Sequence, residues 1–98
     1  MSTDMIVVMS ATVPVAGMPA FRSYEAAVLP LLHDFGATLE RRLRSEDGTR
    51  EIHIVRFSSR ENLDRFRADP RRSNHAHLLA LSGAKTDVTV MRDVAPHS

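Results

Sequence analysis

Residues 35–70 read FGATLERRLRSEDGTREIHIVRFSSRENLDRFRADP. Apolar and polar residues alternate on both sides of the Asp47-Gly48 pair, and an Asp-Gly pair provides the positive φ angles that a tight hairpin turn requires. We therefore expect two paired strands, over residues 37–45 and 50–57. The second strand is the more apolar of the two, which predicts a more central place in its sheet.

A helix is expected directly after this hairpin. Ser58 and Glu61 have the spacing of a capping box, in which a serine and a glutamate satisfy backbone N–H groups at the start of a helix. The segment carries Leu63 and Phe66 as apolar residues. It should stop before Pro70, because the residue that precedes a proline disfavours the helical conformation.

The flanking sequence predicts two further strands and a long helix. Residues 5–13 are apolar and β-branched, as expected of a buried strand, and residues 86–94 predict the last strand. Apolar residues recur at helical spacing over residues 21–35, so one face of this helix is apolar. Pro30 should kink or interrupt the helix because it lacks a backbone N–H, and Gly36 is suited to end it.

A second helical piece is expected after Pro70. Leu78, Leu79 and Leu81 are its inward-facing residues, and Gly83 ends it. The complete order is β-α-β-β-α-β, the ferredoxin-like pattern of an α+β fold, with a four-stranded antiparallel sheet and helices on one face. This arrangement leaves the other face of the sheet to be covered by a further layer.

Length and composition narrow the class of protein. The 98 residues suffice for one domain, 1–98, with an ordered core at about residues 5–94, and so small a domain gains from self-association. A net charge of +1 argues against a nucleic-acid partner, and the absence of cysteine excludes disulfides and cysteine-held metals. No apolar run approaches the roughly 20 residues that span a bilayer. We expect a cytoplasmic protein with no membrane partner and no cofactor.

Three segments carry a family resemblance. They are FRSYEAAVLPLL at 21–32, FGATLERRL at 35–43 and IHIVRFSSRENLDRFRADP at 52–70. With their spacing, they resemble the bacterial domain of unknown function (DUF) 1330 family, which belongs to the dimeric α/β-barrel superfamily. The resemblance covers nearly the whole chain, but Arg56 stands where a glutamate is usual, and residues 73–83 replace a tyrosine-containing stretch.

The resemblance implies a homodimer in which two sheets pack face to face around a barrel-like cavity. It implies a function in binding a small organic ligand in this inter-subunit cavity. An alternative, by analogy of fold only, is a cofactor-independent monooxygenase or isomerase that acts on a small aromatic or lactone substrate. The oxygenase alternative requires a substrate that can itself reduce O₂.

Five residues are candidates to line such a ligand cavity: Tyr24, Glu40, Arg42, His53 and Arg56. Strand alternation predicts Glu40 and Arg42 on one face, and His53 and Arg56 on opposite faces. An acid, a cation and an imidazole could surround a polar ligand, but cross-strand salt bridges explain the same charges, and the sequence favours that alternative. Tyr24 offers a hydroxyl at a cavity mouth, although a core aromatic is the commoner case. The sequence assigns no catalytic residue.

The remaining histidines do not form a convincing metal or haem site. His75 and His77 have a metal-like spacing, but on a helix they point in different directions, and no third ligand lies nearby in sequence. His33 is expected at the surface. No metal is predicted.

Four arginines gather late in the sequence. Because acidic residues interleave with them and no aromatic platform accompanies them, they predict a solvated helix surface and no nucleic-acid site. They are Arg65, Arg67, Arg71 and Arg72.

Overall fold

The structure, a computed structural model, describes residues 4–94. Its four strands form one antiparallel sheet in the order β2-β3-β1-β4. The strands are β1 (Met5–Thr12), β2 (Ala37–Arg44), β3 (Arg50–Phe57) and β4 (Lys85–Met91). The more apolar strand of the predicted hairpin, β3, lies inside the sheet, and β2 and β4 form its edges.

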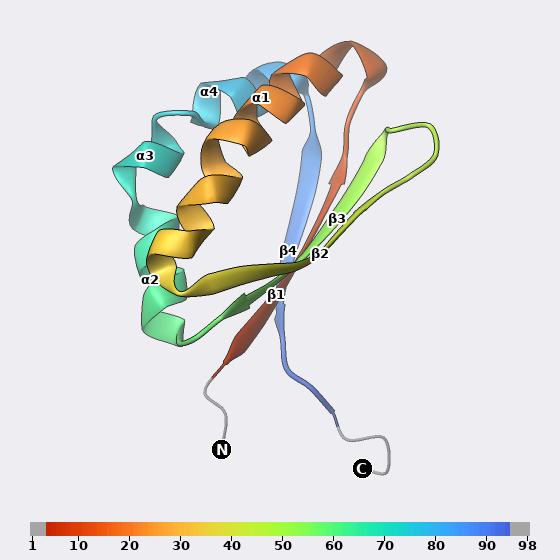
Figure 1. Cartoon of the computed structure of the whole chain (residues 1–98). Coiled ribbons are helices and arrows are strands. Elements are labelled where there is room, and N and C mark those ends of the chain that lie inside the picture. The colour runs from red at the N-terminus through yellow and green to blue at the C-terminus, as the bar shows by residue number, and fades with distance from the viewer. Residues whose placement is uncertain (1–3, 95–98) are drawn as a thin grey trace.

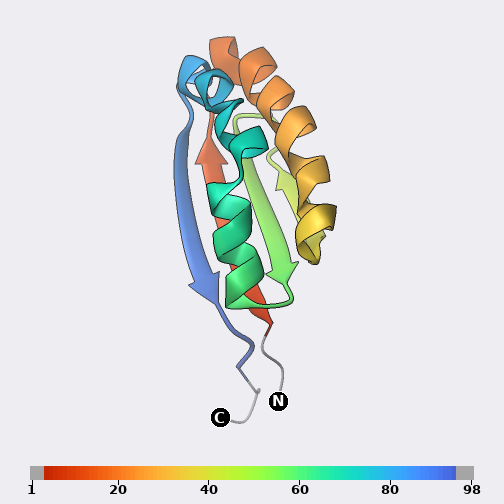
Figure 2. The same cartoon turned by 90° about the vertical axis from the view of Figure 1, so that its left-hand side faces the viewer.

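The helices all lie on one face of this sheet (Figure 1, Figure 2). They are the 3₁₀ segments η1 (Val15–Gly17) and η2 (Leu29–Phe35) and the helices α1 (Met18–Val28), α2 (Arg60–Ala68), α3 (Pro70–Ser73) and α4 (Ala76–Ser82). The order β-α-β-β-α-β and the α+β ferredoxin-like fold are therefore confirmed. Within the described residues, no helix has the length and apolar character needed to cross a lipid bilayer.

The predicted hairpin forms around its Asp-Gly turn. Gly48 has a φ of 78°, a conformation that residues with a side chain rarely adopt. The Asp47 carboxylate accepts a hydrogen bond from the backbone N–H of Thr49 at 3.0 Å and one from the hydroxyl of Ser45 at 2.7 Å. Local chemistry thus fixes the turn and, with it, the pairing of β2 and β3.

The long first helix is interrupted where the sequence predicts. α1 passes into η2 at Leu29, and Pro30 occupies the second position of the 3₁₀ segment. Proline cannot donate the α-helical bond to the carbonyl four residues back, so the chain tightens there. Gly36 ends the segment with a φ of 61°, as expected of a helix-terminating glycine.

Two predictions about the later helices are wrong in detail. The cap of α2 is Ser59 and not Ser58, because the Ser59 hydroxyl accepts the N–H of Asn62, whereas Ser58 accepts the Asn62 side chain. Leu81 does not face inward but is 74% exposed. The helical piece after Pro70 divides into α3 and α4, and the buried residue of α4 is Ser82, which places its neighbour Leu81 on another side of the helix.

The core between helices and sheet consists of two separate clusters. One lies toward η2 and α2, and the other lies toward the start of α1 and α4. Their buried members are Val7, Leu32, Phe35, Val55, Phe57 and Leu63 in the first, and Ala11, Val13 and Phe21 in the second. The space between these clusters holds the polar residues described next.

Candidate functional site

A cavity of about 390 Å³ lies between the helices and the sheet. Its walls are mostly apolar and come from α1, η2, α2, β1, β3, β4 and residues of α3 and α4. Two buried polar side chains line it, Glu25 from α1 and His53 from β3. A concave, mostly apolar space with a few polar groups is the usual form of a small-molecule site.

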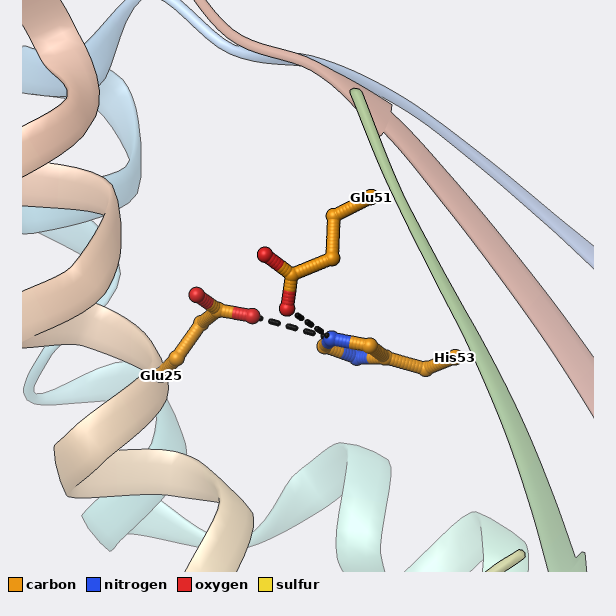
Figure 3. A group of neighbouring side chains, drawn as sticks. All are labelled: Glu25, Glu51 and His53. Atoms are coloured by element: carbon orange, nitrogen blue, oxygen red, sulfur yellow. Dashed lines mark hydrogen bonds and ion pairs between the residues drawn. The ribbon is translucent and has the colours of Figure 1, made fainter. Parts of the chain in front are cut away.

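Glu25, Glu51 and His53 form one buried cluster (Figure 3). Nε2 of His53 lies 2.7 Å from Oε1 of Glu51 and 2.9 Å from Oε2 of Glu25. The two glutamates are 3% exposed and the histidine 4%. Both carboxylates thus meet the same ring nitrogen, and Nδ1 has no hydrogen-bond partner among residues 4–94.

Two arginines of β2 balance the charge of this cluster. Arg42 donates through Nε to Oε1 of Glu51 at 2.7 Å, and Arg44 donates through Nε to Oε2 at 3.0 Å. Arg42 Nη2 also lies 3.1 Å from Oε1 of Glu25. Neither oxygen of Glu25 has a well-directed hydrogen bond, so its contacts with Arg42 and His53 are ion pairs held by proximity.

The environment shifts the pKa values of all three residues, and it separates those of the two glutamates. Burial raises the pKa of Glu25. Burial also opposes the charged form of Glu51, but its interactions with Glu25, Arg42 and His53 outweigh burial and lower the pKa of Glu51. Burial likewise opposes the imidazolium of His53, yet the two carboxylates raise its pKa. Glu51 therefore stays ionised, while Glu25 and His53 compete for a proton.

A β-bulge decides which charges reach this cluster. Leu39 pairs with Val55 but Arg41 pairs with Ile54, so Glu40 is an extra residue in β2. One extra residue reverses the alternation of the strand, and Arg42 comes to lie on the helix-covered face opposite His53. The prediction that Glu40 and Arg42 share a face is wrong for this reason.

The five predicted cavity residues fall into two groups. Tyr24 is half-buried and lines the cavity with His53. Arg42 does not line the cavity but contacts both glutamates of the cluster. Arg56 lies on the opposite face from His53, as predicted, and its Nε lies 3.2 Å from Oε2 of Glu40. Glu40 and Arg56 therefore take no part in this cavity.

Sequence reasoning missed both glutamates of the cluster, although each leaves a signal. Glu25 lies four residues after Phe21 and three before Val28, and both of these are buried, so it occupies the apolar stripe of α1. Glu51 shares strand parity with His53 and with the buried part of β3. A charged residue at a buried position of a helix and another on a buried strand face predict a polar cluster between them.

The cluster also has the donor set of a divalent-cation site. One donor atom from each of Glu25, Glu51 and His53 lies within 4.8 Å of the others, and this is the group in residues 4–94 that could hold a metal. Arg42 and Arg44 already supply two positive charges at the carboxylates, so an added cation would be repelled. The cluster fits a shared proton better than a metal.

The other histidines of residues 4–94 lie outside this arrangement. His75 precedes α4 and its Nδ1 lies 2.8 Å from the carbonyl oxygen of Arg71, and His77 is an exposed residue of α4. His33 is also exposed, in agreement with the prediction.

Solved structures with the same architecture come from several bacteria. Rv0793 of Mycobacterium tuberculosis is 24% identical with a TM-score of 0.76, over 97% of this chain and 99% of that one. SnoaB of Streptomyces nogalater, described as a cofactor-independent oxygenase, is 24% identical with a TM-score of 0.72, over 96% and 98%. A proposed antibiotic biosynthesis monooxygenase of Nitrosomonas europaea is 13% identical with a TM-score of 0.78, over 98% and 95%.

This chain has their ferredoxin-like fold. At these identities the likeness establishes the fold alone. No protein-family model and no curated protein sequence matches the chain. The resemblance to the DUF 1330 family therefore stays a prediction from the sequence.

The histidine of the cluster should titrate above its ordinary pKa of 6.5, because two carboxylates stabilise its charged form. Proton–nitrogen correlation spectra over a pH series measure this, with the His53→Gln variant identifying the signal. Glu25→Gln and Glu51→Gln should each lower the pKa of His53. A titration at or below 6.5 in the unaltered protein would contradict the cluster.

Removing the central carboxylate should destabilise the protein in a pH-dependent manner. Glu51→Gln leaves the buried imidazole of His53 and the partly exposed guanidinium groups of Arg42 and Arg44 without their carboxylate, which costs about 2 kcal/mol in the free energy of unfolding near pH 7. Because folding lowers the pKa of Glu51, its contribution is present above the unfolded pKa and is lost as the pH falls. Urea unfolding should therefore show the two proteins converging in acid.

The matched control for this experiment is Glu61→Gln, at an exposed glutamate of α2. It should change the free energy of unfolding by no more than about 0.5 kcal/mol. Equal stability of the Glu51 and Glu61 variants would argue against a buried charge cluster.

Proposed function

We propose that this protein binds a small, largely apolar organic molecule in the cavity between its helices and sheet, and that His53 exchanges a proton with it. The observation that carries the proposal is a buried imidazole that lines an apolar cavity and is held by two carboxylates. A histidine with a purely structural role needs no free cavity beside it, whereas a histidine that contacts a ligand does, and His53 has such a cavity.

The arrangement of the ring supports a role as general base. Both carboxylates contact Nε2 of His53, which leaves Nδ1 for a ligand in the cavity. When Nδ1 takes a proton, the ionised Glu51 stabilises the resulting imidazolium and keeps the ring oriented. The apolar walls exclude water and strengthen these interactions.

We propose a cofactor-independent oxygenation as the reaction, in line with the description of SnoaB. The overall change is R₂CH₂ + O₂ → R₂C=O + H₂O, and all four electrons that reduce O₂ come from the substrate. His53 removes one C–H proton, and the carbanion passes one electron to O₂. The two radicals combine to form a C–O bond, and the imidazolium protonates the resulting peroxide.

The second half of the reaction needs the same base. His53 takes the remaining C–H proton, the C=O bond forms, and the O–O bond breaks to release hydroxide. The imidazolium then protonates hydroxide to water, which returns His53 to its neutral form. No further oxidant or reductant is required.

Two alternatives use the same cavity. An isomerase would return the proton to another carbon without consuming O₂, and a binding protein would hold the ligand unchanged. Both require the ligand site but not the oxygen step, so oxygen uptake separates them from the oxygenase.

We also propose that two copies pair through the uncovered face of the sheet to form a dimeric α/β barrel. This face carries half-buried apolar residues at its centre, and no helix of residues 4–94 covers it (Figure 1). They are Ile6, Val8, Ile52 and Ile54. The predicted ligand cavity between two sheets lies on this face, whereas the cavity observed lies on the other. A cytoplasmic location stays a prediction from the sequence.

The oxygenase proposal predicts a strong effect of His53→Gln on catalysis. With 1,8-dihydroxyanthrone as substrate, the variant should lose oxygen uptake and ketone formation by about a hundredfold to ten-thousandfold, because the base is gone. Calorimetry under nitrogen should show that it still binds the compound. Glu61→Gln serves as control and should react at the original rate.

Two outcomes of this assay would count against the oxygenase proposal. A His53 variant that reacts within threefold of the unaltered protein would contradict the role of His53. Binding by the unaltered protein without oxygen uptake would replace the oxygenase with one of the two alternatives.

The dimer should depend on the uncovered face. Analytical ultracentrifugation at micromolar concentration should give a dimer, and Ile54→Lys should give a monomer because it places a charge in the centre of the apolar face. Leu81→Lys, at an exposed position on the helix side, should remain dimeric. A monomer in the unaltered protein would count directly against the barrel.

A further inference from the structure

The cavity opens beside the edge strand β4. Most of its lining residues are buried or half-buried, and the exposed ones are Arg67 of α2 with Thr86 and Val88 of β4. β4 forms one edge of the sheet (Figure 2). The opening is therefore between this edge and the α2–α3 segment, and the buried Glu25 and His53 lie deeper in the cavity.

Two arginines line the cavity without a charged partner. Arg67 and the half-buried Arg72 have no ion pair within residues 4–94. Their neighbour Arg71 differs, because it contacts Asp34 at 2.9 Å and Asp69 at 3.1 Å. The four arginines predicted as a solvated helix surface are thus divided. Arg71 is neutralised, Arg65 stacks on Phe35 away from the cavity lining, and the other two leave uncompensated positive charge at the cavity.

Packing holds one of these charges in place. The guanidinium carbon of Arg72 lies 5.5 Å from the centre of the Phe66 ring, and Phe66 itself lines the cavity. A guanidinium stacked on an aromatic ring can still donate hydrogen bonds, because its N–H groups lie in its own plane and point past the edge of the ring. Low-dielectric walls around the opening concentrate the resulting positive potential.

We propose that the ligand carries an anionic group, a carboxylate or a group of like shape and charge, which Arg67 and Arg72 bind at the cavity opening. A guanidinium matches a carboxylate with two parallel hydrogen bonds, which fixes the direction of the ligand as well as its charge. The rest of the ligand is apolar and fills the middle of the cavity. This orientation rests on the proposed function: the reacting end of the ligand lies inward, next to His53.

The two arginines set the orientation of the ligand in addition to attracting its charge. The ligand is amphipathic along its length, with the anion outward and the acidic C–H or O–H group inward. A neutral analogue of the same shape should fill the cavity but lose the contact at the opening.

A pair of isosteric probes tests this directly. Isothermal calorimetry with 1-naphthoate and 1-naphthamide compares a charged with a neutral group on one ring system. The unaltered protein should bind the naphthoate about tenfold more tightly, in keeping with charge-assisted hydrogen bonds that remain partly exposed to water. The double variant Arg67→Gln/Arg72→Gln should lose this preference and bind the naphthamide within twofold of the unaltered protein.

Arg60→Gln is the matched control, since Arg60 is an exposed residue of α2 that does not line the cavity. It removes one positive charge and should keep the preference for the naphthoate. Equal affinity of the unaltered protein for both probes, no measurable binding of the naphthoate, or an equal loss of both probes in the double variant would each overturn the proposal.

The result does not depend on catalysis. Neither probe is converted to a product, so the binding comparison reports on Arg67 and Arg72 at the cavity opening and not on proton transfer by His53. If oxygen uptake fails but the preference for the naphthoate and its loss in the double variant are observed, the anion site stands without the oxygenase. If oxygen uptake depends on His53 but the protein shows no preference for the naphthoate, the oxygenase stands without the anion site.

Discussion

Two buried carboxylates that meet one imidazole nitrogen are the constraint on which the rest of this structure depends. Glu25 and Glu51 are almost completely removed from water, and burial of that kind is unfavourable unless partner charges lie close by. Arg42, Arg44 and His53 provide those charges from two neighbouring strands. The cluster joins α1 to the sheet at the point where the two apolar clusters of the core remain apart.

The β-bulge at Glu40 makes this arrangement possible. If Glu40 paired regularly with Ile54, the alternation of β2 would carry Arg42 and Arg44 to the uncovered face, and Glu51 would lose the hydrogen bonds that they donate. The same bulge sends Glu40 to Arg56 on the other side. One inserted residue thus separates the charges of the hairpin into a buried set beside the cavity and a set on the face proposed to pair.

The sequence predicts the fold because its signals are local. Asp47-Gly48, Pro30 and Gly36 act through their own backbone conformations, and all three behave as expected. The site is harder to predict, because it depends on register: the alternation rule fails at the bulge, and no local pattern marks it. Glu25 is missed for a different reason. A helix is recognised from the spacing of its apolar residues, and a single carboxylate among them is easily overlooked as a buried residue.

The two arginines that contact the buried cluster, Arg42 and Arg44, also reach the solvent. Glu51 is 3% exposed, but the side chains of Arg42 and Arg44 are 40% and 39% exposed along β2, the sheet edge opposite β4. Dissolved anions can therefore approach the cluster from one edge of the sheet, whereas the cavity opens at the other. The carboxylates that hold His53 therefore stay in electrostatic contact with the solvent through Arg42 and Arg44, whether or not the cavity is occupied.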